Sequence, residues 1–242
     1  MKTRRLALIG VVVALFASAC ATTQQVVVSD AGYCPFLGSS LCAQLTQTAT
    51  PGRFSSGAKS EGGVALANLR YLNPSAQWAK YDKVLIAPVT YWAGDDSNIS
   101  PEDQHKLTDF FQQALTQQLS TKYAVVREPG AGVMLVQVAL VDASSATPVL
   151  RTISMLIPQA RALATLKYVA TGTYAFIGSA EAEAKIADSQ THQVLAAGVD
   201  KRVGGGSVVT AAQWQWGDAE NAITAWSKQI TDRLTELKAG KP

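Results

Sequence analysis

The side chains best placed for chemistry are acidic residues and a histidine near one turn of the chain. Glu181 and Glu183 alternate along an expected strand, Asp188 follows in the turn, and His192 comes four residues later. Carboxylates that converge with an imidazole at a hairpin end could bind a hard cation. Alternation along a strand instead favours a solvent-exposed acidic face, because facing carboxylates without a cation repel one another. We therefore predict no metal site, and Glu181, Asp188 and His192 form only a speculative cation site.

The sequence contains no complete catalytic motif. Zinc needs three or four convergent ligands, and neither His105 nor His192 belongs to an H-E-x-x-H motif or a histidine cluster. Ser179 lacks the second glycine of a nucleophile elbow, and the glycines at 204–206 are not followed by the G-K-[ST] of a phosphate-binding loop. We therefore predict that the protein is not an enzyme and has no cofactor.

Residues 1–19 have the three parts of a cleavable secretory signal. Basic residues at 2–5 precede an apolar run from Leu6 to Phe16 and the small residues Ala17-Ser18-Ala19. The apolar run is shorter than the roughly 20 residues that a membrane-spanning helix needs, so a retained membrane helix is the weaker interpretation. The sequence predicts a signal peptide over 1–19 and export of the rest.

The residue after this signal is Cys20, and Ala17-Ser18-Ala19-Cys20 is similar to a bacterial lipobox. In a lipobox the cysteine is acylated and becomes the new N-terminus. Ordinary signal peptidase could also cleave after Ala19 and leave a free thiol. If Cys20 is lipidated, Cys34 and Cys42 remain as an even pair that can bond in an oxidising compartment. This cysteine count favours lipidation over a free thiol at Cys20. Because Ala21 rather than aspartate follows, the usual Gram-negative sorting rule implies the periplasmic face of the outer membrane.

The pair Cys34 and Cys42 predicts a possible disulfide that closes a small ring. A metal or redox role would need further nearby ligands or a C-x-x-C spacing, and the sequence has neither. We interpret the pair as a local staple within residues 20–62. This segment has few charges and no sustained periodicity, so we predict a lipidated tether.

The charge balance changes when the signal is removed. The chain has 21 Lys and Arg against 18 Asp and Glu, and three of the basic residues (Lys2, Arg4 and Arg5) lie in the signal. The mature chain therefore has 18 basic and 18 acidic side chains. A neutral domain lacks the field that collects phosphates, so nucleic acid is not an expected partner.

Residues 63–240 predict a single α+β domain. Helical signals are a hydroxyl cap with proline at Ser100-Pro101, and a stripe of apolar residues from Ala219 to Leu237. Apolar or alternating runs predict strands at 83–89, 123–127, 133–141, 181–187 and 193–201. The fold class we expect is a mostly antiparallel sheet of about five strands, with two long amphipathic helices packed on one face. The apolar segment 148–176 would either pack on the sheet edge or form an exposed patch.

The order of several motifs resembles a known family. They are Leu69-Arg70-Tyr71-Leu72-Asn73-Pro74, Trp78-x-x-Tyr81-Asp82-Lys83-Val84-Leu85-Ile86-Ala87-Pro88-Val89, Glu128-Pro129-Gly130, Leu156-Ile157-Pro158, Gly178-Ser179-Ala180-Glu181-Ala182-Glu183, Ala187-Asp188-Ser189 and Trp216-Gly217-Asp218-Ala219. In this order, over about residues 34–237, they are similar to the Gram-negative predicted lipoproteins catalogued as domain of unknown function 3313. That family usually has glycine where His192 stands. The resemblance implies a lipoprotein address and supplies no catalytic residues.

These observations predict an outer-membrane-anchored periplasmic lipoprotein with a non-enzymatic domain. The acyl chains on Cys20 would bind the membrane, and the domain would bind a protein partner in the envelope or assist envelope assembly. The alternative is a small-molecule or metal-binding module that uses the hairpin end at 181–192. A hydrolase would need a cleft that brings His105 or His192 to a serine and an aspartate.

Overall fold

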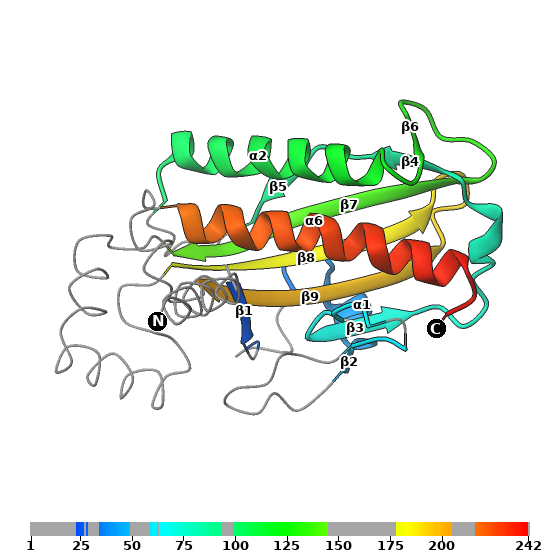
Figure 1. The fold of residues 1–242 in the computed structure, drawn as a ribbon, viewed down its shortest axis with the longest axis horizontal. Coiled ribbons are helices and arrows are strands. Elements are labelled where there is room, and N and C mark those ends of the chain that lie inside the picture. Colours follow the sequence, from blue (N-terminus) through cyan, green and yellow to red (C-terminus); the bar gives the residue numbers. More distant parts are fainter. Residues whose placement is uncertain are drawn as a thin grey trace, which may run out of the picture.

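The computed structural model of the chain describes residues 23–26, 28, 34–48, 59–61, 63–92, 99–144, 178–204 and 216–241. The signal peptide, Cys20 and the apolar segment 148–176 lie outside these residues. Within the described ranges the chain forms one α+β unit, in which a sheet packs against two long helices (Figure 1). No helix in these ranges has both the length and the apolarity needed to cross a membrane.

The described strands form a nine-stranded mixed sheet. The strands are β1 (Thr23–Val26), β2 (Thr46–Gln47), β3 (Leu69–Leu72), β4 (Lys83–Ile86), β5 (Thr90–Tyr91), β6 (Ala124–Val126), β7 (Val133–Ser144), β8 (Ser179–Asp188) and β9 (Val194–Gly204). The main path through the sheet runs β2-β3-β9-β8-β7-β4-β6, with β1 beside β9 and β5 beside β7. All five predicted strands are present.

The prediction of a mostly antiparallel sheet of about five strands was wrong in two respects. The β7–β8–β9 meander is antiparallel, but β4 runs parallel to both β6 and β7, and β5 runs parallel to β7. The parallel pairs arise because α2 (Pro101–Leu119) carries the chain back across the sheet between β5 and β6. The strands missing from the prediction, β1, β2, β3 and β5, have four residues or fewer, too few for a clear alternation.

The two long helices, α2 and α6 (Gly217–Lys238), lie side by side on one face of the sheet (Figure 1). Ser100 caps α2 by accepting a hydrogen bond from the backbone N–H of Asp103, and Pro101 occupies the first turn, as predicted. Phe111 of α2 stacks on Trp226 of α6 with ring centroids 6.0 Å apart. The main hydrophobic core lies between these helices and the sheet.

The opposite face of the sheet carries a second, smaller core. A loop closed by the disulfide Cys34–Cys42 covers it and includes the one-turn helix α1 (Ser39–Cys42). Leu37 and both cysteines pack there against Leu69 and Val199. The described parts of the predicted tether 20–62 therefore lie on the domain, because they bury apolar side chains and pair with its strands.

Candidate functional site

The hairpin end at 181–192 is built around the carboxylate of Asp188. Its Oδ1 accepts hydrogen bonds from the backbone N–H groups of Gln190 and Thr191, each 3.0 Å long. Its Oδ2 accepts one from the Tyr81 hydroxyl at 2.8 Å and lies 3.4 Å from Nζ of Lys80. The donors, led by the Thr191 N–H, hold the pKa of Asp188 well below its usual range. This carboxylate is occupied in holding the turn to the segment before β4.

The structure does not bring the speculative cation ligands together. Glu181 lies seven residues from Asp188 along β8, a separation of about 23 Å for extended chain. It pairs with Lys201 at 3.0 Å instead. His192 is exposed in the turn and has a left-handed φ of 58°. Within the described ranges, no three His, Cys, Asp or Glu side chains are grouped so that they could hold a metal ion.

Glu183 is fully buried, although strand alternation predicted an exposed acidic face. The side chain points to the face covered by the disulfide loop, where Oε2 accepts hydrogen bonds from the backbone N–H groups of Leu37 at 2.7 Å and Phe36 at 3.2 Å. Its other oxygen, Oε1, has no hydrogen-bond partner among the residues that the structure describes. Desolvation outweighs the two N–H donors and raises the pKa of Glu183 to about 7. The carboxyl group therefore attaches the loop to the sheet and titrates near neutral pH.

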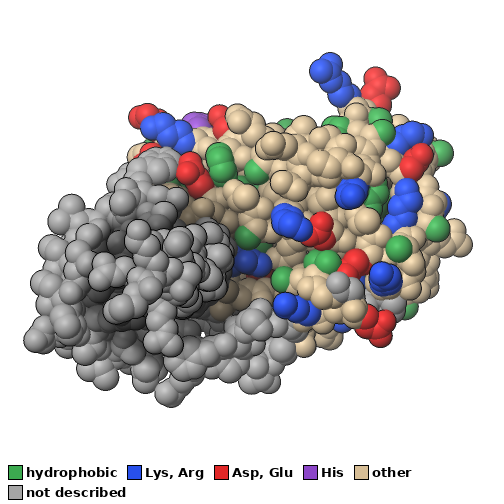
Figure 2. Space-filling model, in the orientation of Figure 1, with side chains coloured by type: hydrophobic (Ala, Val, Ile, Leu, Met, Phe, Trp, Pro, Cys, Tyr) green, Lys and Arg blue, Asp and Glu red, His purple; other side chains and the backbone are tan. Residues whose placement is uncertain are grey.

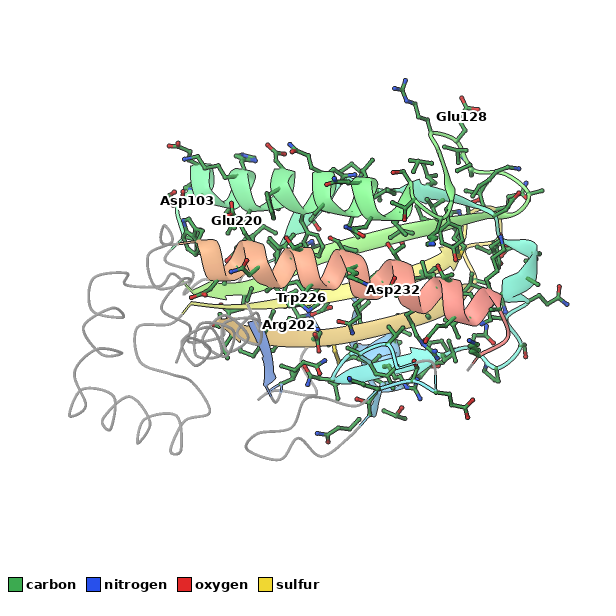
Figure 3. The ribbon with its side chains drawn as sticks, in the orientation of Figure 1. Asp103, Glu128, Arg202, Glu220, Trp226 and Asp232 are labelled. Carbon is green, nitrogen blue, oxygen red and sulfur yellow. A yellow bond between two sulfur atoms is a disulfide. The ribbon has the colours of Figure 1, made fainter. Side chains whose placement is uncertain are left out.

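A third acid, Asp200 of β9, joins β9 to α6 and to the N-terminal strand. Its Oδ2 accepts hydrogen bonds from Nε1 of Trp226 at 2.7 Å and from Nε of Arg202 at 3.0 Å. Its Oδ1 accepts from the side chain of Gln25 and from the backbone N–H of Asn68. Burial raises the pKa of Asp200, and the neighbouring guanidinium of Arg202 opposes that rise. Figure 3 shows Trp226 and Arg202 between α6 and β9.

Beside this network, an apolar cavity of about 130 Å³ lies under α6. Its floor is a row of residues paired across the sheet, in which Val138 of β7, Ala184 of β8, Gly198 of β9 and Arg70 of β3 are neighbours. Ala184 and Gly198 contribute little side-chain volume to the middle of this row, and Ala182 and Ala196 extend it along the strands. A helix that packs over such small residues leaves space that its own side chains do not fill.

The roof of the cavity consists of large side chains. Trp226, Ile230, Leu234 and Leu237 project from α6, and Phe111 of α2 closes one side. An apolar cavity of about 150 Å³ stays dry and accepts a benzene-sized molecule. The space under α6 is of that size, so it can hold a small apolar group.

Two cationic side chains, Arg70 of β3 and Arg233 of α6, also line the cavity. Burial and the charge of Arg233 together lower the pKa of Arg70. Arg233 donates from Nη1 to Glu236 at 3.0 Å and to the Lys241 carbonyl at 3.1 Å. Its Nη2 is buried and has no acceptor in the described part of the chain. The cavity is therefore apolar over most of its wall and positive at one place.

The cavity was not predicted from the sequence, although a signal was present. Alternation with Glu181 and Glu183 places Ala182, Ala184 and Ile186 on one strand face, and Ala196 and Gly198 lie opposite Ile186 and Ala184 on β9. Small residues at alternate positions of two adjacent strands indicate a shallow floor under whatever covers them. Of the other predicted site residues, Cys34 and Cys42 form the disulfide and His105 is exposed on α2, whereas Cys20 lies outside the described residues.

Comparisons with known proteins give a family and distant structural likenesses. A family model described as "Protein of unknown function (DUF3313)" matches residues 53–230. Solved structures that resemble the chain include the PelC dodecamer from Paraburkholderia phytofirmans, with 11% identity, a TM-score of 0.38 and coverage of 68% of this chain and 94% of that chain. Protein XCC0632 from Xanthomonas campestris has 13% identity and a TM-score of 0.39, with coverage of 70% of this chain and 91% of that chain.

A third likeness is to lipoprotein GNA1162 from Neisseria meningitidis, with 12% identity, a TM-score of 0.31 and coverage of 62% of this chain and 98% of that chain. These structural likenesses are too distant to assign a function. No curated protein matches the chain.

Proposed function

The chain belongs to the DUF3313 family of proteins of unknown function, and we propose that it is a lipoprotein anchored through Cys20 to the periplasmic face of the outer membrane. The observation that carries this proposal is the Cys34–Cys42 disulfide, and the position of β1 sets how closely an anchor at Cys20 would hold the domain. Thr23, only three residues after Cys20, already pairs with Gly204 of β9. An acylated Cys20 would therefore hold the sheet within about 10 Å of the lipid headgroups, since extended chain spans at most about 3.5 Å per residue.

The disulfide in the described loop supports export to an oxidising compartment. Cys34 and Cys42 are bonded, and disulfides persist in the periplasm and outside cells but are rare in the cytosol. With that pair bonded, Cys20 is the remaining cysteine of the three in the sequence. This arrangement fits acylation of Cys20.

Metabolic labelling with an alkyne fatty acid, followed by membrane fractionation, tests the anchor. Cys20→Ala should abolish labelling and release the protein to the soluble periplasm. The double variant Cys34→Ser/Cys42→Ser is the matched control and should keep the label. Ala21→Asp should keep the label but move the protein to the inner membrane. A Cys20→Ala protein that still fractionates with the outer membrane would refute the anchor.

We further propose that the domain is a non-enzymatic binding domain for a protein of the cell envelope. The three perturbed acids support a structural role for the buried charges, because Glu183, Asp188 and Asp200 each hold one element of the fold to another. Charged side chains of both signs are interspersed on the face shown in Figure 2, consistent with a domain that does not recruit partners by a single-sign field. Of the described residues, Trp92 and Val125 are the large hydrophobic side chains exposed to solvent, at 46% and 41%.

Site-directed photo-crosslinking in cells tests partner binding. A photo-reactive amino acid at Trp92 or Val125 should give a discrete crosslinked species that is recovered by pull-down. The control position is Glu128, which projects into solvent beyond β6 (Figure 3) and should give background only. Equal background at all three positions would count against a partner on either surface.

A second candidate function is a small-molecule binding module, which the cavity under α6 favours. The sequence suggests the hairpin end at 181–192 as the place for a small-molecule or metal site. The structure instead uses Asp188 internally and separates it from Glu181, whereas the cavity provides an unfilled apolar space with a cationic wall. This candidate does not depend on membrane anchoring.

A further inference from the structure

We propose that the cavity under α6 binds a single-chain anionic amphiphile, with its apolar chain between α6 and β8–β9 and its carboxylate head group between Arg70 and Arg233. The inference specifies the ligand of the second candidate function and is independent of the proposed anchor and protein partner. It rests on the composition of the cavity wall, the cavity volume, and the buried Nη2 of Arg233, which has no acceptor among the described residues.

The apolar part of the wall selects the chain. The floor consists of small aliphatic residues and the roof of large apolar ones, and the polar atoms of Asp200 already have partners in the Trp226 and Arg202 network. A polar body would leave its own hydrogen-bonding groups unpaired against such a wall, at a cost that exceeds the gain from contact. A methylene chain has no hydrogen-bonding groups to leave unpaired there, and each buried methylene contributes about 0.8 kcal/mol to the binding free energy.

The charged part of the wall selects the head group. Three guanidinium groups lie around the cavity and its Asp200 network, those of Arg70, Arg202 and Arg233, and two carboxylates oppose them, Asp200 and Glu236. Arg202 pairs with Asp200, and Arg233 pairs through Nη1 with Glu236. No side-chain acceptor for Arg70 is found among the described residues.

Among the described side chains that line the cavity, the buried donor without an acceptor is Nη2 of Arg233. Buried donors without a partner are rare in folded proteins, and each one calls for an explanation such as a bound ion or ligand. A carboxylate placed between Arg70 and Arg233 would accept from Nη2 and reduce the repulsion between two like charges. Guanidinium groups bind carboxylates with two parallel hydrogen bonds, which suits a planar anionic head group.

A head-group series on the wild-type domain tests the proposal without any substitution in the cavity. The protein used is the chain from Cys20 to Pro242 with Cys20→Ala, purified oxidised, so that its own acyl chains cannot occupy the cavity. Decanoate, decanol and decyltrimethylammonium share an apolar chain and differ in head-group charge, and each is used below its solubility limit or micelle concentration. Isothermal titration should show that decanoate binds about tenfold or more tightly than the other two, as expected for hydrogen bonds to a charged group.

A chain-length series then measures the apolar contribution. From butyrate to decanoate, each added methylene should tighten binding about fourfold until the cavity is full, after which the affinity should level off. At a surface site the affinity would not level off at a fixed chain length, and variants that reduce the cavity volume would not change it. Ala184→Leu fills the floor and should shorten the plateau or abolish binding, whereas Ala124→Leu adds the same volume on exposed β6 and should change nothing.

Charge-neutralising variants locate the head group. Arg70→Gln and Arg233→Gln should each weaken decanoate binding about tenfold and leave decanol binding unchanged. Arg127→Gln, at an exposed residue directly after β6, is the matched control and should bind as the wild type does. Thermal unfolding of each variant verifies the fold. Equal affinity for the three head groups, or unchanged decanoate binding in the double variant Arg70→Gln/Arg233→Gln, would overturn the proposal, and neither result would affect the membrane anchor.

Discussion

The carboxyl group of Glu183 predicts that the domain loses stability as the pH rises through neutrality. Glu183 is 0% exposed, and burial raises its pKa from 4.5 to about 7. An acid whose pKa is higher in the folded than in the unfolded state binds its proton more tightly when folded. Its contribution is therefore fully present below pH 4.5 and is lost as the pH rises through about 7. A shift of this size corresponds to about 3 kcal/mol of unfolding free energy.

The variant Glu183→Gln isolates this contribution. Glutamine has the same shape, stays neutral at every pH, and can still accept from the Phe36 and Leu37 N–H groups. Near pH 5 we expect the two proteins to unfold with free energies within about 1 kcal/mol of each other. By about pH 8.5 the variant should be more stable by about 3 kcal/mol. Urea denaturation followed by tryptophan fluorescence at intervals of half a pH unit gives the difference curve.

The same titration has a local readout, because Oε2 of Glu183 holds the loop through two backbone N–H groups. If the loop undocks before the domain unfolds, the pH dependence should appear in hydrogen exchange at the Leu37 amide, corrected for intrinsic rates. Glu128→Gln removes an exposed acid and should leave the wild-type curve unchanged. Parallel stability curves for wild type and Glu183→Gln, together with pH-independent protection at Leu37, would refute the reasoning.

Other substitutions test the rest of the framework. Asp200→Ala should lower the unfolding free energy by about 3–5 kcal/mol, because it leaves the buried charge of Arg202 without its carboxylate. Asp232→Ala breaks an ion pair on the surface of α6 and should change the unfolding free energy by less than about 1 kcal/mol; chemical denaturation measures both variants. His192→Gly should raise the melting temperature and stabilise the domain by about 0.5–1 kcal/mol, since glycine adopts the left-handed φ of 58° without strain, and a lower melting temperature would contradict this. Cys34→Ser/Cys42→Ser opens a short ring and should cost about 2–3 kcal/mol by chain entropy, measured against wild type under oxidising conditions.

Local sequence signals predicted where helices and strands occur more reliably than they predicted which distant residues those elements contact. Ser100 and Pro101 placed the start of α2 correctly, because a cap and a fixed φ act within one turn. Asp218 stands directly before the apolar stripe that begins at Ala219 and has a side chain typical of a helix cap, but α6 begins at Gly217 and the Asp218 carboxylate accepts from the backbone N–H of Gly178. That contact joins residues 40 positions apart and has no local signature.

The alternation at 181–187 shows the same limit. It correctly assigned Glu183 to the face opposite Ala182, but it could not show what covers that face. The cover is a loop 146 residues earlier in the chain, and its backbone N–H groups rather than its side chains make the contact. The cavity has a similar origin, because the volume left under α6 depends on which residues of two distant elements face each other.

The register of β1 on β9 has a consequence for where the cavity lies relative to a bilayer. Thr23 pairs with Gly204, and the cavity floor uses Ala196 to Asp200, four to eight residues further along β9. At about 3.3 Å per residue the floor lies about 13–26 Å from the anchored end of the strand. With Cys20 acylated, a chain in the cavity would have left the leaflet completely. An amphiphile bound there would then have its chain between α6 and the sheet rather than among the acyl chains of the leaflet.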